Sequence, residues 1–464
     1  MKTLRATAAF AAVSLIAVAG CSRSGSSSSG SSSSPSATTA VAASTTTGGD
    51  FGTLKAVCGP GHATGATAPG VSNTEIDVST MADPGNTAAP GLDQELFDTA
   101  TAFMTWCNAA GGILGRKIVV HDRDAKLFYV NQAMVAACSD FALVGNGEAF
   151  DSAGVTTRLK CGLPEIPSYD DSSEATEAPL KVQPNPNPIE QVNIGFLRAA
   201  KEIAPNDTKL GMLVGNLAGV TTSGLRDKEA AIQLGYTVPY YTLYPATGIV
   251  NPLSYVQQMK AAGVQVETLV GDNSAQVLLD KAMQTLNWYP DVMVFAANFY
   301  DPNFPKNTGT ALKNTWVGTA YYPFELSAQN PPTAQYVNIM KSDDPGGKIS
   351  AIGVEGWDAW MLFATAVKAC GSNLTRACLL QQAADQPNWT GGGIKPPVNT
   401  TTTNRQAGPC LLMLKVTAAG FSPDTSVLAP TPGDGPFNCD PANVAHLKTN
   451  YEPTDLPAGF SPQI

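Results

Sequence analysis

Hydrophobic and polar positions follow two different periods along most of this chain. Residues 75–80 and 117–121 have the pattern of short strands, and residues 92–108 between them have the apolar spacing of an amphipathic helix. Ala109-Ala110-Gly111-Gly112 ends this helix, because glycine is common just beyond a helix C-terminus. Together the three segments predict a βαβ unit.

The same order recurs further along the chain. Residues 130–138 and 154–160 are predicted helices, and residues 141–145 and 163–168 are predicted strands. Repeated βαβ units imply a parallel sheet with helices on both faces and right-handed crossovers.

A proline-rich stretch at residues 183–188 interrupts this order, and a helix is predicted at residues 189–204. A second βα series then follows. Its predicted strands are residues 210–214, 237–243, 266–270 and 292–296, and its predicted helices are residues 223–234, 253–262 and 275–286. The chain returns through residues 315–321 to a long helix at 357–370 and a final strand at 411–416. This pattern favours two α/β lobes over one large sheet.

The first twenty residues have the layout of a secretory signal peptide. Lys2 and Arg5 precede an apolar run at residues 8–19, which is too short for a bilayer that needs roughly 20 residues. Val18-Ala19-Gly20-Cys21 resembles the bacterial lipobox, so we expect residues 1–20 to be removed and the Cys21 thiol to carry diacylglycerol. The alternative is an ordinary secretory signal with an incidental cysteine.

Residues 22–49 are almost entirely Ser, Thr, Gly and Ala, a composition that cannot bury a core. We expect residues 21–70 to form a flexible tether and N-terminal arm that keeps the protein at the outer face of the cell membrane. The lipid anchor is then its only contact with the membrane. We expect the folded part to be a monomer.

Composition adds two limits. The chain has 464 residues, of which 43% are hydrophobic, so it can bury a large core. Its net charge is −10 with only 14% charged residues, which argues against nucleic acid or anionic lipid as a partner, because both require basic patches.

The nine cysteines become eight if Cys21 carries lipid, and an even number in an exported chain indicates disulfides. Local spacing favours the pairs Cys370–Cys378 and Cys410–Cys439. The predicted helices that end at Cys138 and Cys161 lie on the same face of the sheet, which favours Cys138–Cys161 and leaves Cys58–Cys107. The alternative is that one or more of these last four is a buried free cysteine.

Catalytic motifs are scarce. The three histidines are far apart in the predicted fold, at His62, His121 and His446, and no nucleophile elbow, Walker A motif or dinucleotide fingerprint occurs in a suitable context. Asp170 and Asp171 are a candidate acid/base pair, although adjacent residues rarely converge on one reacting atom. We therefore expect no enzyme, no metal and no cofactor, with an extracytoplasmic hydrolase as the less favoured alternative.

Two segments at the start of the folded part carry a family resemblance. Residues 70–78 and the run Asn108-Ala109-Ala110-Gly111-Gly112-Ile113-Leu114-Gly115-Arg116 resemble the opening of type I periplasmic solute-binding proteins of the Leu/Ile/Val-binding family. Further matching segments are residues 142–145, 162–167 and 356–360, and the resemblance extends from about residue 70 to about residue 445.

This resemblance implies an α/β fold of two flavodoxin-like lobes with parallel sheets, joined by a three-strand hinge, that close on a ligand. We place the first lobe at residues 71–188 and 322–390, the second at 189–321 and 391–445, and a C-terminal tail at 446–464. It also implies amino-acid transport, with a small polar ligand delivered to an ABC transporter permease. The same fold serves ligand sensors for signalling receptors, which is the alternative.

In such sheets a ligand binds beyond the carboxyl ends of the strands. The candidate ligand-binding residues are therefore polar or aromatic residues of the loops that follow strands: Asn146, Glu148, Phe150, Tyr169, Asp170, Asp171, Ser172, Asn216, Asp272, Asn273, Asn298 and Tyr300.

The family's amino-acid binders hold the ligand carboxylate with Ser, Thr and backbone N–H groups, whereas this chain has Glu148, Asp170 and Asp171 at those places. A cationic, amide or polyhydroxyl ligand suits these loops at least as well as an amino acid. Asp170, Asp171 and Ser172 have a second interpretation as caps of the next helix. The aromatic residues at 321–324, together with Trp357 and Trp360, are predicted to pack in the core rather than to contact ligand.

Overall fold

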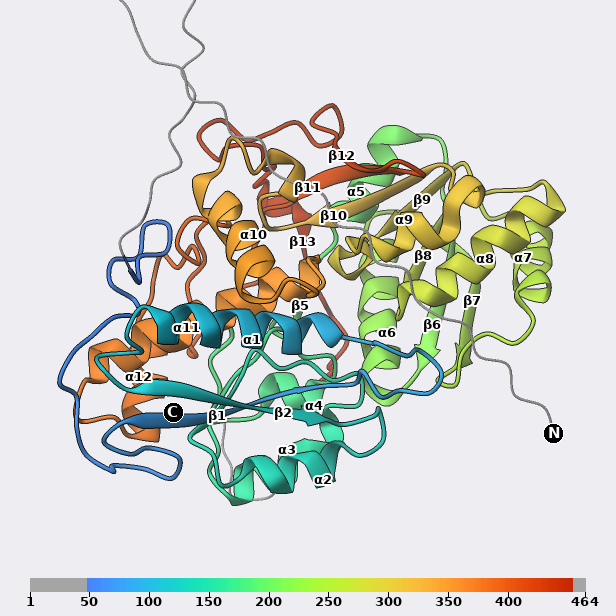
Figure 1. The fold of residues 1–464 in the computed structure, drawn as a ribbon. Helices are drawn as coiled ribbons and strands as arrows, with labels where there is room; N and C mark the ends of the chain where they lie inside the picture. The colour runs from blue at the N-terminus through green and yellow to red at the C-terminus, as the bar shows by residue number, and fades with distance from the viewer. Residues whose placement is uncertain (1–47, 454–464) are drawn as a thin grey trace, which may run out of the picture. The chain divides into compact units, whose positions relative to one another are not determined.

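A computed structural model describes residues 48–453 of the chain (Figure 1). The predicted signal peptide, Cys21 and most of the predicted tether lie outside the described residues. Within residues 48–453, no helix is both long enough and apolar enough to cross a membrane.

The first lobe is built on a parallel sheet with the strand order β2-β1-β3-β4. Figure 1 shows α1 and α11 on one side of β1 and β2, and α2 and α3 on the other side. The strands are β1 (Glu75–Ala82), β2 (Lys117–Asp124), β3 (Ala142–Val144) and β4 (Glu165–Ile166). The helices are α1 (Gln94–Ala109), α2 (Val130–Ala137), α3 (Ser152–Lys160), α4 (Ser173–Glu177), α10 (Pro331–Asp343), α11 (Ala351–Cys370) and α12 (Arg376–Ala384).

Aromatic side chains form the centre of the first lobe. Trp357 and Trp360 of α11 are completely buried, and the Trp360 ring stacks on Phe103 of α1 with 4.8 Å between ring centroids. Both tryptophans thus belong to the core, as predicted.

The segment that precedes β1 is packed against this core. Phe51 is 0% exposed and lies 5.1 Å from Trp357 between ring centroids, and Cys58 is bonded to Cys107 of α1. A flexible tether that extends to about Gly70 is therefore wrong, because residues from Phe51 onward bury apolar surface.

The second lobe is built on a seven-stranded sheet with the order β12-β11-β10-β9-β8-β6-β7. Strands β6 to β10 are parallel, whereas β11 pairs antiparallel with both β10 and β12, so this sheet is mixed rather than purely parallel. Its strands are β6 (Lys209–Asn216), β7 (Thr237–Pro245), β8 (Val266–Val270), β9 (Val292–Phe295), β10 (Thr315–Thr319), β11 (Leu412–Thr417) and β12 (Gly420–Pro423).

Helices cover both faces of this second sheet. Met293 and Phe295 of β9 point into one core cluster, and Val292 and Val294 point into another, because neighbouring side chains of a strand alternate between faces. The helices are α5 (Gly195–Ile203), α6 (Ala218–Gln233), α7 (Pro252–Ala261), α8 (Asn273–Leu286) and α9 (Asn303–Thr308). Short 3-10 turns are η1 (Ala297–Phe299), η2 (Gly309–Ala311), η3 (Phe324–Leu326) and η4 (Pro441–Asn443).

The single helix predicted at residues 189–204 is wrong. Its first part is strand β5 (Gln191–Asn193), and helix α5 begins only at Gly195. Strand β5 pairs with β13 (Val444–His446), which lies close to the end of the described chain. Residues 411–416 are therefore not the final strand, since β12 and β13 follow them. A partner so distant in sequence leaves no local signal.

The two-lobed α/β fold itself is confirmed. The chain passes from the first lobe to the second before β5, returns after β10 to form helices α10 to α12, and crosses again to β11. Three connecting segments thus join the lobes. The residue boundaries that we gave to each lobe stay a prediction.

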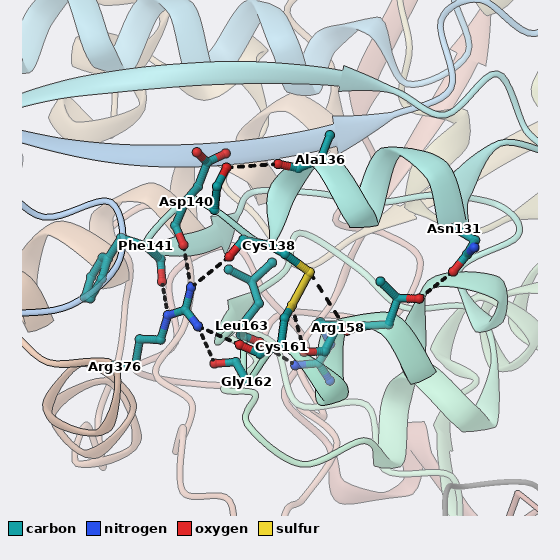
Figure 2. The surroundings of a disulfide bond; sticks show 12 residues. Asn131, Ala136, Cys138, Asp140, Phe141, Arg158, Cys161, Gly162, Leu163 and Arg376 are labelled. Atoms are coloured by element: carbon teal, nitrogen blue, oxygen red, sulfur yellow. Dashed lines mark hydrogen bonds between the residues drawn. A yellow bond between two sulfur atoms is a disulfide. The ribbon is translucent and has the colours of Figure 1, made fainter.

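The described part of the chain contains four disulfides, and they join the cysteines that the sequence pairs: Cys58–Cys107, Cys138–Cys161, Cys370–Cys378 and Cys410–Cys439. Figure 2 shows the guanidinium group of Arg376, the first residue of α12, pointing toward backbone carbonyls beside Cys138 and Cys161. It donates hydrogen bonds to the carbonyl oxygens of Cys138, Asp140, Phe141, Cys161 and Gly162. Arg376 therefore anchors α12 to both ends of this disulfide.

Candidate functional site

A cleft of about 530 Å³ lies at the carboxyl ends of the parallel strands of both sheets. Its walls come from loops after β1, β2, β3 and β4 in the first lobe and after β6, β7, β8 and β9 in the second. Doubly wound sheets bind ligands at this edge, and the volume falls in the range of small-molecule sites. The cleft is therefore the candidate functional site.

The wall from the first lobe includes a hydrogen-bonded pair, Tyr169 and Asp93. The Tyr169 hydroxyl donates a 2.8 Å hydrogen bond to Asp93 Oδ2. Burial, together with the neighbouring Glu95 charge, raises the pKa of Asp93 well above its usual value. Burial likewise raises the pKa of Tyr169, so its hydroxyl stays a hydrogen-bond donor.

Asp171 also faces the cleft from this wall. Asp151 accepts hydrogen bonds from the backbone nitrogens of Asp171, at 2.8 Å, and Ser172, which fixes the backbone. The Asp171 carboxylate itself has no hydrogen-bond partner among residues 48–453. Burial raises its pKa well above the usual value, and the nearby charges of Asp151 and Asp170 raise it further.

The wall from the second lobe is shaped by the loops after β8 and β9. Asp272 caps α8 by accepting a hydrogen bond from the Ser274 nitrogen, and Asn298 Nδ2 donates to the Gly271 carbonyl at 2.8 Å. Both side chains line the cleft. Their polar groups are partly used to hold the two loops in place.

Of the cleft-lining residues that the structure describes, Arg226 is the only cationic one. Its Nη2 donates to the carbonyls of Pro188, at 2.9 Å, and Gln191, at 2.6 Å, and reaches Asn187 Oδ1 at 3.3 Å. Burial lowers the pKa of Arg226. This arginine thus fastens α6 to the segment that joins the lobes.

Two further carboxylates line the cleft. Burial raises the pKa of Asp227, on α6, to about 6, and that of Glu355, in the first part of α11, to about 8. Neither residue was a candidate from the sequence. The position of Asp227 in a helix after a strand is a weak signal, whereas Glu355 has none, because α11 enters the cleft from far along the chain.

Of the twelve candidate residues, five line the cleft: Tyr169, Asp170, Asp171, Asp272 and Asn298. Asp170 is tied to neighbours, since Lys181 and Gln183 both donate to its carboxylate. Seven others do not line it: Asn146, Glu148, Phe150, Ser172, Asn216, Asn273 and Tyr300.

Four of the seven lie beside or behind the wall from the first lobe. Asn146 donates to Glu165 Oε1 at 2.9 Å and to Glu148 Oε2 at 3.3 Å within a buried polar network. Ser172 caps α4, as the alternative interpretation holds, by accepting a hydrogen bond from the Ala175 nitrogen. The Phe150 ring packs edge-on against Phe128.

The other three belong to the second lobe. Asn216 is exposed at the end of β6, and Asn273 Nδ2 lies 3.4 Å from the Asn298 carbonyl. Tyr300 is buried, where its hydroxyl donates to Glu325 and accepts from the Phe324 nitrogen. The sequence placed these residues in the correct loops but could not give the direction of their side chains.

The two lobes touch beside the cleft. Ser223 Oγ on α6 donates to the Asp171 carbonyl at 3.2 Å, and Gly219 on the same helix lies against Ser172. The structure therefore has the lobes in contact at this edge.

One cluster has the residue types of a catalytic triad. His121 Nδ1 lies 3.0 Å from Asp140 Oδ1, but Ser79 Oγ donates to Asp140 and not to the histidine. Arg123 also donates to Asp140, at 2.8 Å. In a Ser-His-Asp triad the serine hydroxyl donates to the histidine, which acts as its base, so this cluster is instead a polar network around the buried Ser79 and Asp140. Within residues 48–453, no group of three His, Cys, Asp or Glu side chains is placed to hold a metal ion.

Comparison with solved structures places the fold among known binding proteins. A fatty acid ABC transporter substrate-binding protein from Thermomonospora curvata has a TM-score of 0.66 at 17% identity, over 77% of this chain and 93% of that one. A possible leucine/isoleucine/valine-binding protein from Rhodopirellula baltica SH 1 has a TM-score of 0.64 at 13% identity, over 78% of this chain and 98% of that one.

A third structure is LivJ, the branched-chain amino acid transporter substrate-binding protein from Streptococcus pneumoniae, in complex with isoleucine. It has a TM-score of 0.61 at 15% identity, over 76% of this chain and 100% of that one. At these identities the likeness shows the fold alone. None of the curated proteins compared is similar enough to count as a match.

The family comparison covers most of the chain. The model described as "Periplasmic binding protein" matches residues 83–421, which include all the residues that line the cleft and every strand of the two sheets except β1 and the end of β12. The predicted resemblance to type I periplasmic binding proteins is confirmed by this match and by the solved structures. This chain therefore belongs to the periplasmic binding protein family.

Proposed function

We propose that this protein is a lipid-anchored, extracytoplasmic solute-binding protein that captures a small molecule between its lobes and delivers it to an ABC transporter permease. The observation that carries this proposal is the cleft of about 530 Å³ at the carboxyl ends of both sheets. An affinity near one micromolar, about −8 kcal/mol, would suffice for this role.

The location rests on the sequence. The signal-peptide layout and the lipobox-like Val18-Ala19-Gly20-Cys21 support export and lipidation, and the Ser-rich and Thr-rich residues 22–49 support a slack tether. Such an anchor would keep a binding protein close to its permease. Labelled fatty acid that is incorporated into the wild-type protein, but not into a Cys21→Ala variant, tests this part of the proposal.

Binding without catalysis is supported by the side chains in the cleft. The Ser79, His121 and Asp140 cluster is arranged for a structural network, and the lining residues that belong to positions 48–453 include no histidine or cysteine. We therefore propose that the ligand leaves chemically unchanged. Mass spectrometry of a ligand recovered after prolonged incubation tests this point.

A thermal-shift screen of the purified protein tests binding itself. The screen should include amino acids, amides, polyamines, sugars and short aliphatic amines and acids. A ligand that binds only the folded protein raises the unfolding midpoint by mass action. A cleft variant that fills the space, Thr268→Trp, should lose the response, whereas Asp385→Asn, an exposed carboxyl at the end of α12, should keep it. If no compound raises the midpoint, the proposed function fails.

A further inference from the structure

We infer that the cleft takes an amphipathic ligand with an apolar body and a protonated amine or other N–H donor, and that it disfavours ligands whose polar group is a carboxylate. This inference rests on the proposed function, because it names the class of molecule that would occupy the same cleft. Three features of the cleft lining support the inference: its charge, its unpartnered polar atoms and its apolar surface.

Acidic side chains dominate the charge of the cleft. Its lining contains Asp93, Asp170, Asp171, Asp227, Asp272 and Glu355. Asp170 is neutralised by Lys181, with 2.5 Å between Oδ1 and Nζ. Among residues 48–453, the remaining acids have only Arg226 as a cationic companion in the lining. Burial raises the pKa of Asp93, Asp171 and Glu355, so a cationic ligand group favours their ionised form, whereas a ligand carboxylate opposes it.

Arg226 is poorly placed to receive a ligand carboxylate. Carboxylates in proteins are held best by a guanidinium with two free parallel N–H groups. Here Nη2, which belongs to both possible pairs of parallel N–H groups, is already engaged by the carbonyls of Pro188 and Gln191. Among residues 48–453, Nε has no partner but is buried, so neither pair is free for a ligand. Asp227 is the next residue after Arg226 in α6, and its carboxylate offsets the charge of the guanidinium group.

Several polar atoms that face the cleft still lack partners. Among residues 48–453, the carboxylates of Asp171, Asp227 and Glu355 accept no hydrogen bond from another residue. Thr268 on β8 is only 1% exposed and lines the cleft, and its hydroxyl also has no partner in this part of the chain. In their ionised form the carboxylates only accept, and the Thr268 hydroxyl can accept. A cationic N–H donor, which also favours that ionised form, is therefore the complementary ligand group.

The rest of the lining is largely apolar. Leu92, Leu127 and Ile352 come from the first lobe, and Phe196, Leu217 and Ile249 come from the second. Apolar surface on both walls would be removed from water only by an apolar ligand body. A small polar amino acid leaves much of this surface exposed, whereas an aliphatic amine covers it and places its ammonium among the carboxylates.

Isothermal titration calorimetry with three eight-carbon probes tests the inference at neutral pH: octylamine, octanamide and octanoate. These probes share one apolar chain and differ only in charge and donor capacity. We expect octylamine to bind at least about tenfold more tightly than octanoate, with octanamide between them, because only the ammonium group makes charge-assisted hydrogen bonds with the carboxylates.

Asp171→Asn is the matched variant, since it keeps the shape of the side chain but cannot become the carboxylate that pairs with an ammonium group. We expect it to weaken octylamine binding about tenfold and to change octanamide binding by less than about threefold. Asp385→Asn, outside the cleft, should leave all three affinities unchanged. Circular dichroism tests whether each variant is folded. If Asp171→Asn does not fold, the comparison of the three probes on the wild-type protein still tests the inference.

The two hypotheses fail in different ways. The proposed ligand class is wrong if octanoate binds as tightly as octylamine. It is also wrong if neither probe binds while a sugar or an amino acid raises the unfolding midpoint. In both cases the proposal of solute binding is unaffected. If no compound in the broad screen binds, the proposed function fails as well.

Discussion

Gly219, the second residue of α6, packs directly against the backbone of Ser172 in the other lobe. A β-carbon on Gly219 would lie 2.9 Å from the Ser172 nitrogen and 3.1 Å from its α-carbon. Backbone atoms cannot rotate away as a side chain does, so any residue larger than glycine has to push the lobes apart here.

Gly219→Val should therefore hold the cleft open. We expect a larger radius of gyration by small-angle X-ray scattering and loss of the ligand-induced rise in unfolding midpoint. Gly346→Val is the control, because no atom lies within 4 Å of a β-carbon at that position. Equal radii for the Gly219→Val variant and the wild type would contradict this role of Gly219.

Lys181 joins two buried carboxylates, that of Asp170, which lines the cleft, and that of Glu165. Its Nζ lies 3.1 Å from Glu165 Oε2 and 2.5 Å from Asp170 Oδ1, and all three side chains are buried. Lys181→Met should lower the free energy of unfolding by about 3–5 kcal/mol, because it leaves buried charge uncompensated. Chemical denaturation measures this loss. Lys160→Met, at an exposed position, is the control. If both variants lower the free energy of unfolding equally, the prediction for Lys181 is wrong.

We expect Asp280 to make the stability of the protein depend on pH. It is completely buried on α8, and burial raises its pKa from 3.8 to about 8. The folded state then binds the proton more tightly than the unfolded state. The resulting stabilisation is full below about pH 4 and is lost as the pH rises through about 8. We expect the unfolding midpoint to fall over this window.

Asp280→Asn should flatten that part of the pH profile and raise the midpoint more at pH 9 than at pH 5. The amide keeps the acceptor for Gln276 Nε2, which lies 2.9 Å from Asp280 Oδ1. Scanning calorimetry across pH measures the effect, and the exposed Asp385→Asn serves as the control. If the unfolding midpoint of Asp280→Asn depends on pH as in the wild type, another group causes that dependence. The neighbouring Glu267, whose pKa burial also raises, is then the first group to test.

The four disulfides should differ in their contribution to stability. Cys58–Cys107 closes a sequence separation of 49 residues and Cys370–Cys378 one of only 8. In the chain-entropy model this difference favours the longer loop by about 1.6 kcal/mol. The double serine variant of the first pair should therefore unfold at a lower denaturant concentration than that of the second. If the variant without Cys370–Cys378 unfolds at the lower denaturant concentration, loop length does not control how much each disulfide stabilises the protein.

Much of the fold was predictable because its signals are local. Strands β1, β2 and β8 begin at the predicted residues, and helices α2 and α3 end within one residue of the predicted limits. Alternation and helical spacing are set by residues a few positions apart. The misassigned segment at Gln191–Asn193 is a strand only because Val444–His446 pairs with it. That partner is invisible to any local pattern.

The candidate site was predictable only at the level of loops. Strand ends placed Tyr169, Asp171 and Asp272 near the ligand edge, and these three line the cleft. The same reasoning could not distinguish them from Glu148 or Tyr300, whose side chains turn into buried networks. Side-chain direction depends on which partners the rest of the chain brings close.

The sequence alone therefore determined the βα order and the family, because period, turn residues and the Gly111-Gly112 segment are local features. The tertiary structure decided which carboxylates remain free, since Lys181 reaches Asp170 but no cation reaches Asp171 within residues 48–453. It also brought Glu355 of α11 into the cleft. Electrostatics at a binding site depends on distances between segments far apart in sequence, and only the folded chain sets those distances.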